Sequence, residues 1–373
     1  MVHRNLSVAL VGSYPPPYGG VQAHIARVHA RLRNVGIHSV VYCAYSKGLK
    51  DEPGLRMVKT PRWARWRLSY WGYHWLPAYG LKLRRCVVHC HQQWNMAAPM
   101  LLLALRGSQI VMTIHDQMLT QRWKQLAPWD RLAARRLLRH EGVAWIGVSD
   151  VVCSQLVGLG VPPSRITKLP AYIPLDAETV AKEKLPAALS AFVDCHDPVI
   201  TTYAWMLVRD ENGDDLHSLD HCVNLVRDLR TDCPNMGLVI LLANASQRDL
   251  LEQLRDHIRM RGVENQVLIC DQPLRDASRL WLASDLYLRA TTTDGDALSV
   301  REALSVGVPV VASDAAPRPE GTLVFRKRDY ESLLTMAKYV LNNRASCRES
   351  LKGISMPDNF SPLLALYERL GVR

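Results

Sequence analysis

The feature that most constrains the fold is an alternation of short apolar runs with amphipathic helical segments. Helical patterns such as 21–34, 247–261 and 329–343 separate most of the apolar runs. Strands that alternate with helices in this way predict parallel sheets with helices on both faces, and therefore an α/β fold. We expect strands at 6–11, 38–42, 87–90, 110–114, 143–148, 199–204, 238–243, 267–270, 286–289 and 309–312.

The alternation runs twice, which predicts two doubly wound, Rossmann-like domains. A segment with prolines and charges around 170–197 interrupts it. We expect a first domain over 1–175, a linker over 176–197 and a second domain over 198–355, followed by a C-terminal helix over 356–373 that packs back on the first domain. Such sheets bind ligands outside the carboxyl ends of their strands, so two facing domains predict a ligand cleft between them.

The cysteines and the apolar runs bear on location and on metal binding. No apolar run is long enough to cross a bilayer and no signal peptide is evident, so we expect a cytoplasmic protein whose nine cysteines are reduced. Cys86, His89, Cys90 and His91 invite a zinc interpretation. They lack a second ligand pair at zinc spacing, so we favour a structural role and expect no bound metal.

Positive charge is concentrated in one segment. The formal net charge is +11, which favours anionic partners, and no acidic residue occurs between Glu52 and Asp116. Residues 56–86 combine Arg and Lys with Trp63, Trp66, Trp71 and Trp75. Indoles and basic side chains favour an anionic membrane surface. The competing interpretations are interior packing of the indoles and binding of single-stranded nucleic acid. We favour the membrane and expect no nucleic acid partner.

The stretch TTTDGDALSVREALSVGVPVVASD, residues 291–314, places two acids around the start of a helix expected near Val300. Ser299 and Glu302 fit a capping box, in which Glu302 only caps its own helix. Alternatively, the first amides of the helix bind a phosphate and the carboxylate accepts hydrogen bonds from sugar hydroxyls. The spacing alone leaves both interpretations open.

The same stretch resembles the signature of family 4 glycosyltransferases, which have the GT-B fold. The family pattern is an acid, seven residues, a Glu, and then Gly-x-Pro-Val-Val-Ala. Asp294 and Glu302 fall on the two acids, with Asp in place of the usual Glu at 294. The resemblance implies that Asp294 meets the donor sugar and that Glu302 meets the ribose. It also implies that the diphosphate meets the backbone amides of Ala297, Leu298, Ser299 and Val300.

Two N-terminal stretches agree with this resemblance. YPPPYGGVQAHI matches the Gly-Gly loop of the family, where Gly19 and Gly20 let the backbone approach a ligand closely. VMTIHD matches a strand that ends in a histidine, here His115, which in the family faces the reaction centre. An ordinary strand–helix turn and a structural histidine are the competing interpretations.

One region departs from the family. Relatives carry an Arg and a Lys-Gly early in the second domain to bind the diphosphate, whereas this chain reads YAWMLVRDENGDDL. Arg209 is the only base there. We expect Arg209, Arg301 or Arg318 to bind the diphosphate instead; if none does, we expect an impaired enzyme. For Arg209, the competing interpretation is a solvated surface charge.

The resemblance implies a retaining hexosyltransferase. No metal-binding acid cluster such as Asp-x-Asp in a suitable loop is evident, so we expect it to be metal-independent. It would move a sugar from a UDP- or GDP-linked donor to an acceptor hydroxyl, with a lipid-linked glycan in polysaccharide synthesis as one acceptor class. The donor is a substrate, so no cofactor is expected. Two alternatives remain open, a non-catalytic nucleotide-sugar-binding protein and a sugar-nucleotide epimerase on the same architecture.

Overall fold

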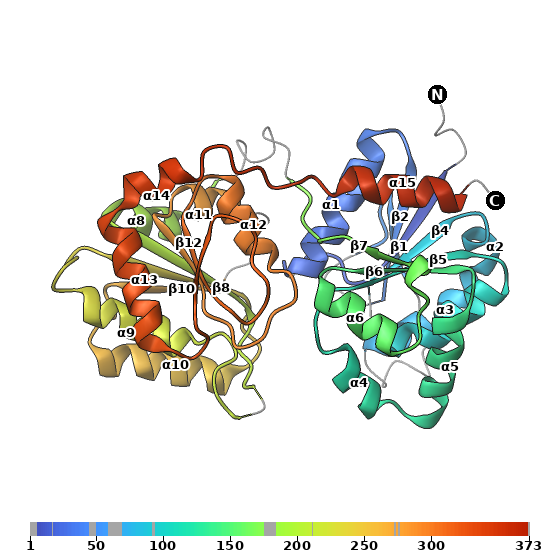
Figure 1. Cartoon of the computed structure of the whole chain (residues 1–373), viewed down its shortest axis with the longest axis horizontal. Coiled ribbons are helices and arrows are strands. Elements are labelled where there is room, and N and C mark those ends of the chain that lie inside the picture. Colours follow the sequence, from blue (N-terminus) through green and yellow to red (C-terminus); the bar gives the residue numbers. More distant parts are fainter. Residues whose placement is uncertain are drawn as a thin grey trace. The chain divides into compact units, whose positions relative to one another are not determined.

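The computed structural model describes residues 6–16, 18–44, 50–58, 69–91, 94–174, 184–210, 212–271, 274 and 277–371. The chain forms two compact units (Figure 1). The first contains residues 1–16, 21–173 and 358–373, and the second contains residues 17–20 and 174–357.

A parallel sheet of seven strands forms the centre of the first unit, in the order β3-β2-β1-β4-β5-β6-β7. Five of these strands match the predicted runs within one or two residues. The short edge strands β3 and β7 were not predicted, because three residues are too few to show a periodic pattern. The strands are β1 (Ser7–Val11), β2 (His38–Cys43), β3 (Leu55–Met57), β4 (Val87–Cys90), β5 (Gln109–Ile114), β6 (Val143–Gly147) and β7 (Ile166–Lys168).

Helices cover both faces of this sheet because its strands are buried on both sides. Alternate residues of β1 show the two layers: Val8 and Leu10 pack with α1 (Gly20–Asn34) and α15 (Phe360–Gly371), whereas Ala9 and Val11 belong to the opposite core. That second core includes α3 (Ala97–Leu105), α5 (Pro128–Arg139) and α6 (Asp150–Gly158). The remaining elements are η2 (Ser69–Tyr79), α2 (Gly80–Leu83), η3 (Trp94–Met96), α4 (Leu119–Gln125) and η4 (Pro163–Arg165).

The C-terminal helix α15 completes the first unit. Asp358, just before it, forms a 2.7 Å ion pair with Arg31 of α1, and the Asn359 amide donates to the Tyr172 carbonyl. Phe360 and Tyr367 are buried in the core between α1 and the sheet. The last residues of the chain are therefore part of the unit that the first residues begin.

The second unit has a six-stranded parallel sheet in the order β10-β9-β8-β11-β12-β13. Only β13 lies outside the predicted runs. Helices again cover both faces, with α9, α10 and α13 on one side and α8, α11 and α12 on the other. The strands are β8 (Val199–Met206), β9 (Gly237–Asn244), β10 (Val267–Cys270), β11 (Leu286–Arg289), β12 (Val310–Ser313) and β13 (Thr322–Phe325). The helices are α8 (Ala187–Cys195), α9 (Leu219–Leu229), α10 (Arg248–Arg261), α11 (Ser278–Leu282), α12 (Leu298–Ser305), α13 (Tyr330–Asn342) and α14 (Arg344–Ser350).

The segment expected to be a linker contains a helix of the second unit. Helix α8 lies inside 176–197 and buries Leu189 against β9 and α12, with Phe192 and Val193 packed beside it. This helix was not predicted, because its apolar face has only a few residues and the surrounding segment is rich in prolines and charges. Among the described residues, no helix is long and apolar enough to cross a membrane.

The packing of α15 gives a stability prediction. Phe360 is 2% exposed, and its truncation in Phe360→Ala leaves a cavity that lowers the free energy of unfolding by about 3–5 kcal/mol. Chemical denaturation monitored by circular dichroism measures the change. Leu105→Ala is the control, because Leu105 is 64% exposed and its loss is expected to cost less than about 0.5 kcal/mol. Equal effects of the two substitutions would contradict the packing of α15.

Candidate functional site

The loop between β11 and α12 is held by one carboxylate shared between two arginines. Asp294 forms a bidentate pair with Arg289, at 3.0 Å from Nε to Oδ2 and 3.1 Å from Nη2 to Oδ1. Arg318 Nη1 lies 2.8 Å from the same Oδ2, and its Nε donates to the Ser313 carbonyl. The three charged side chains are between 3% and 12% exposed. The site therefore has a rigid ionic base at the carboxyl end of β11.

This arrangement keeps Asp294 ionised. Burial by itself would raise the pKa of the carboxyl group, but the charges and hydrogen bonds of Arg289 and Arg318 outweigh burial and hold the pKa well below its ordinary value. The reach of Asp294 toward a donor sugar is thus limited by its two partners. Arg318, predicted to face a diphosphate, is instead a partner of Asp294 and Ser313 and is 3% exposed.

Helix α12 begins two residues earlier than the sequence indicated. Its N-cap is Ala297, which makes no side-chain cap, so the capping-box interpretation of Ser299 and Glu302 is wrong. The Ser299 hydroxyl accepts a 2.7 Å hydrogen bond from Tyr287, and Glu302 Oε2 accepts a 3.1 Å bond from the Trp281 indole. Glu302 is 9% exposed, so its carboxylate lies mostly inward, against α11. The prediction that it meets a ribose stays untested.

The start of α12 provides amides for an anion. The Val300 amide already donates to the Ala297 carbonyl at 3.1 Å, which removes one of the four predicted amides from that role. The amides of Leu298 and Ser299 belong to the first turn, where no intrahelical acceptor exists. First-turn amides and the helix dipole together favour negative charge at this end.

Arg209 lies in a different environment from the one predicted. Its guanidinium donates to the Gly213 carbonyl at 2.7 Å and to Gln253 Oε1 at 2.5 Å. It lines a cavity of about 440 Å³ together with Asp214, Asp215 and Asp220. These three acids outnumber Arg209 and Arg328, the two arginines of the cavity, and oppose a diphosphate. Because Arg209 is also exposed, the geometry favours the competing interpretation of Arg209 as a solvated surface charge. Arg301 is also paired, at 2.7 Å with Asp296.

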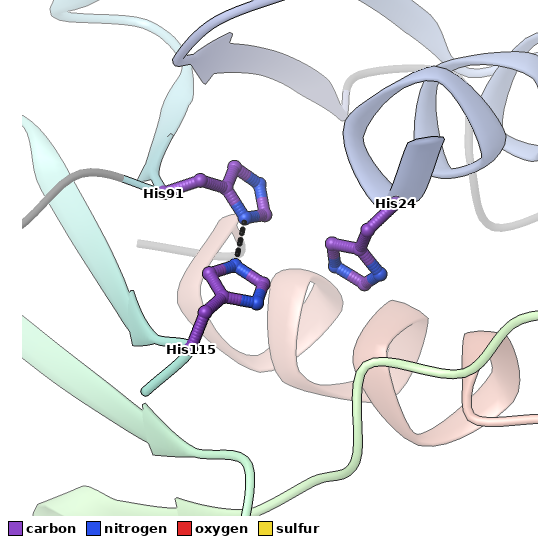
Figure 2. Close-up of side chains that lie close together, drawn as sticks. All are labelled: His24, His91 and His115. Atoms are coloured by element: carbon purple, nitrogen blue, oxygen red, sulfur yellow. Dashed lines mark hydrogen bonds between the residues drawn. The ribbon is translucent and has the colours of Figure 1, made fainter. Parts of the chain in front are cut away.

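In the first unit, His115 lies at the carboxyl end of β5 beside two other histidines (Figure 2). His91 follows β4, and its Nδ1 lies 3.2 Å from Nε2 of His115. His24, on the first turns of α1, has its ring centroid 5.4 Å from that of His115 and 5.2 Å from that of His91. The Gly-Gly loop leads into this helix, and a Cβ added at Gly20 would meet no atom within 4 Å.

The histidines are neutral because their surroundings disfavour charge. Burial lowers the pKa of His24 to about 4, and the pKa values of His91 and His115 lie well below the ordinary one because of burial and neighbouring imidazoles. His89 supports the cluster from beneath: its two ring nitrogens bond to Tyr367 and Thr113, and its ring lies 3.9 Å from that of His91.

Comparison with known proteins shows which family and which folds the chain resembles. Residues 18–177 match the model of Glycosyltransferase Family 4. The whole chain superposes on HepE of Anabaena, solved with UDP and glucose, with a TM-score of 0.71, 12% identity and coverage of 99% and 100% of the two chains. A glycosyltransferase from Rickettsia africae gives a TM-score of 0.67 at 14% identity, covering 98% and 99%. WaaG, a glycosyltransferase involved in lipopolysaccharide biosynthesis, gives 0.69 at 16%, covering 97% and 99%.

The chain resembles the family 4 glycosyltransferases, whose model matches residues 18–177. Its two parallel sheets with flanking helices are those of the GT-B fold, as predicted. The structural likeness, at identities of 16% or less, concerns the fold, whereas the family match covers the Gly-Gly loop and His115. No curated protein matches the sequence.

Several residues of the candidate site were not identified from the sequence of this glycosyltransferase. Arg289, at the end of β11, and Trp281 of α11 were missed because an apolar strand and a short helix gave them no motif. His24 was missed because its role depends on β4 and β5, which are far from it in the sequence. The one signal in the sequence for these residues was an arginine, Arg289, at the end of an apolar strand and five residues before an acid, Asp294.

The basic, Trp-rich segment is only partly described. Trp63 and Trp66, with Arg62, Arg65 and Arg67, lie outside the described residues. Trp75 packs against the first-unit core, which fits the interior-packing interpretation at this position. Lys82, Arg84 and Arg85 are exposed.

The shared carboxylate gives a prediction for the second unit. Asp294→Asn leaves Arg289 and Arg318 buried without their counter-charge and lowers the free energy of unfolding by about 3–5 kcal/mol. Asp256→Asn is the matched control, because Asp256 is exposed and its pair with Arg259 contributes less than about 1 kcal/mol. Urea denaturation of the variants measures both. Loss of less than about 1 kcal/mol in Asp294→Asn would contradict the ionic role.

Proposed function

We propose that this glycosyltransferase moves a sugar from a UDP- or GDP-linked donor to an acceptor hydroxyl with retention of configuration. The observation that carries the donor site is the start of α12, where first-turn amides follow the carboxyl end of β11 and the carboxylate of Glu302 lies on the same helix. HepE, on the same fold, was solved with UDP-glucose, which supports a nucleotide-linked donor.

In this proposal the diphosphate leaving group rests on the amides of Leu298 and Ser299. The amides and the helix dipole offset the charge that develops as the sugar leaves. Arg289 and Arg318 neutralise Asp294, so that this acid does not repel the diphosphate. Compared with the family pattern, the chain relies less on cationic side chains, because Arg209, Arg301 and Arg318 are bonded to other groups of the protein.

His115 is the group we assign to the donor sugar on the first unit. Its imidazole is half-buried at a strand end and neutral, which suits hydrogen bonding to sugar hydroxyls rather than charge pairing. Retention then requires the acceptor hydroxyl to attack from the face that the diphosphate leaves. Positioning supplies most of the acceleration in such a reaction.

A second function is favoured by the same paired arginines. If amides alone do not offset the leaving-group charge, the chain binds the nucleotide sugar without transferring the sugar. Both functions require donor binding, and only transfer releases nucleoside diphosphate.

The acceptor we propose is a lipid-linked glycan at an anionic membrane surface, as in polysaccharide synthesis. Besides Lys82, Arg84 and Arg85, one face of α5 supports this. Trp129 and Leu132 are 71% and 51% exposed, and the exposed Arg136 and Arg139 follow at helical spacing. Helix α3, which packs against α5, adds exposed Leu102 and Leu105. An apolar strip edged by bases matches an interfacial helix.

The donor site is tested by removing one amide. Leu298→Pro removes the N–H at the first helical position, where proline is tolerated and the extended Ala297 fits a following proline. Loss of one charge-assisted hydrogen bond of about 1.5–3 kcal/mol weakens UDP or GDP binding roughly tenfold to a hundredfold by calorimetry. Leu298→Ala is the control, because it loses the same side chain and keeps the amide. Equal affinities of the two variants would refute the amide site.

Transfer itself is tested with His115→Ala. Purified protein, a panel of UDP- and GDP-sugars and membrane extract are expected to release nucleoside diphosphate, and His115→Ala is expected to lower kcat about 10²-fold or more. Glu302→Ala is expected to reduce release strongly as well, through the ribose. His140→Ala, on a half-buried histidine of the same unit, is the control. Donor binding without release under every acceptor condition would establish the second function instead.

Membrane docking is tested with vesicles. Arg136→Gln with Arg139→Gln removes about 2 kcal/mol of attraction to anionic lipid, or roughly thirtyfold in partitioning, as measured by sedimentation with phosphatidylserine vesicles. Arg255→Gln, on an exposed base of the second unit, is the control. Unchanged partitioning of the α5 variant, or equal binding to zwitterionic vesicles, would refute docking through this face.

A further inference from the structure

The first unit brings three imidazoles together at one edge of its sheet. One nitrogen from each of His24, His91 and His115 can be chosen so that all three lie within 4.8 Å of one another (Figure 2). We propose that these histidines bind a divalent transition-metal ion of the zinc class. The site lies at the carboxyl ends of β4 and β5 and on the first turns of α1, and sugar transfer as proposed above does not require it.

The spacing is close to that of a tetrahedral zinc site. Zinc–nitrogen bonds of about 2.0–2.1 Å place neighbouring ligand nitrogens about 3.4 Å apart. His91 Nδ1 and His115 Nε2 already lie 3.2 Å apart. Within the 4.8 Å limit, His24 needs to approach by no more than roughly 1–1.5 Å to complete the geometry.

The ring of His24 is oriented as a ligand. Its Nδ1–H donates to the Ala171 carbonyl at 2.6 Å, which fixes the tautomer and leaves Nε2 with a free lone pair. Metal-binding histidines typically donate their second nitrogen to a backbone carbonyl or carboxylate in this way.

His91 and His89 differ in how their nitrogens are bonded. His91 is 4% exposed, and its Nδ1 lies toward His115 at 3.2 Å, which makes Nδ1 the ligand atom of this residue. His89 shows the contrast: it lies against His91, but both of its nitrogens are bonded, to Tyr367 and Thr113, so it is excluded as a ligand.

The ligand set defines the class of ion. Three imidazoles suit zinc, copper, iron or nickel and do not suit magnesium or calcium, which prefer oxygen. Three protein nitrogens leave one tetrahedral position for water or for an oxygen of a bound molecule. Because His115 is also the residue assigned to the donor sugar, metal and sugar would compete for its nitrogen.

Direct metal binding tests the proposal without nucleotide or acceptor. The full chain, stripped with a chelator and dialysed, is titrated with Zn²⁺ against a chromophoric chelator and with Co²⁺ by visible absorption. We expect one site per chain and the intense d–d bands of tetrahedral cobalt. His24→Ala and His91→Ala are each expected to weaken Zn²⁺ binding at least tenfold. His38→Ala, on an exposed histidine, is expected to leave it unchanged.

Near-ultraviolet circular dichroism shows whether each variant folds. If His91→Ala does not fold, His24→Gln takes its place, because Gln can still donate to the Ala171 carbonyl while removing the imidazole. Zn²⁺ affinity unchanged in the His24 variant, or a weak octahedral cobalt spectrum in the unaltered chain, would overturn the proposal. Loss of glycosyl transfer alone would not, since binding is measured without donor.

Discussion

The carboxylate of Asp294 is the interaction on which the second unit depends. It joins three segments that are separate in the sequence: the end of β11, the loop before α12 and the residues after β12 that carry Arg318. Two buried guanidinium groups require a fixed anion, and the anion requires both of them to remain ionised at this depth. The position of the α12 N-terminus, and hence of its first amides, follows from this arrangement.

The same constraint explains how the chain departs from its family. Arg289 and Arg318 both pair with Asp294, and neither remains exposed for a diphosphate. Meanwhile the loop after β8 carries Asp214 and Asp215 beside Arg209. The donor site proposed here therefore depends on backbone amides, which no side-chain substitution short of proline removes.

Much of the fold was predictable because strands that are buried on both faces consist of continuous apolar runs, such as Ile110–Ile114 and Leu238–Leu242. Edge strands β3, β7 and β13 escaped, since they are short and less buried. The site was predictable only where residues lie close in the sequence. Asp294 and Glu302 were identified from the motif. The ion pairs of Asp294 with Arg289 and Arg318 could not be predicted, because they depend on the direction in which each side chain points. The start of α12 was misplaced because Ser299 bonds to Tyr287 of a neighbouring strand, and not to its own helix.

The histidine cluster shows what topology adds to sequence. In a parallel sheet the residues that follow neighbouring strands meet at one edge, so His91 after β4 and His115 after β5 lie together although 24 residues separate them. Helix α1 adds His24 because it returns over the same edge from β1, the next strand along. Tyr367 of α15 fixes His89, which in turn supports His91. The C-terminal helix thus reaches the candidate site through the rings of His89 and His91, so its return to the first unit serves the site as well as the core.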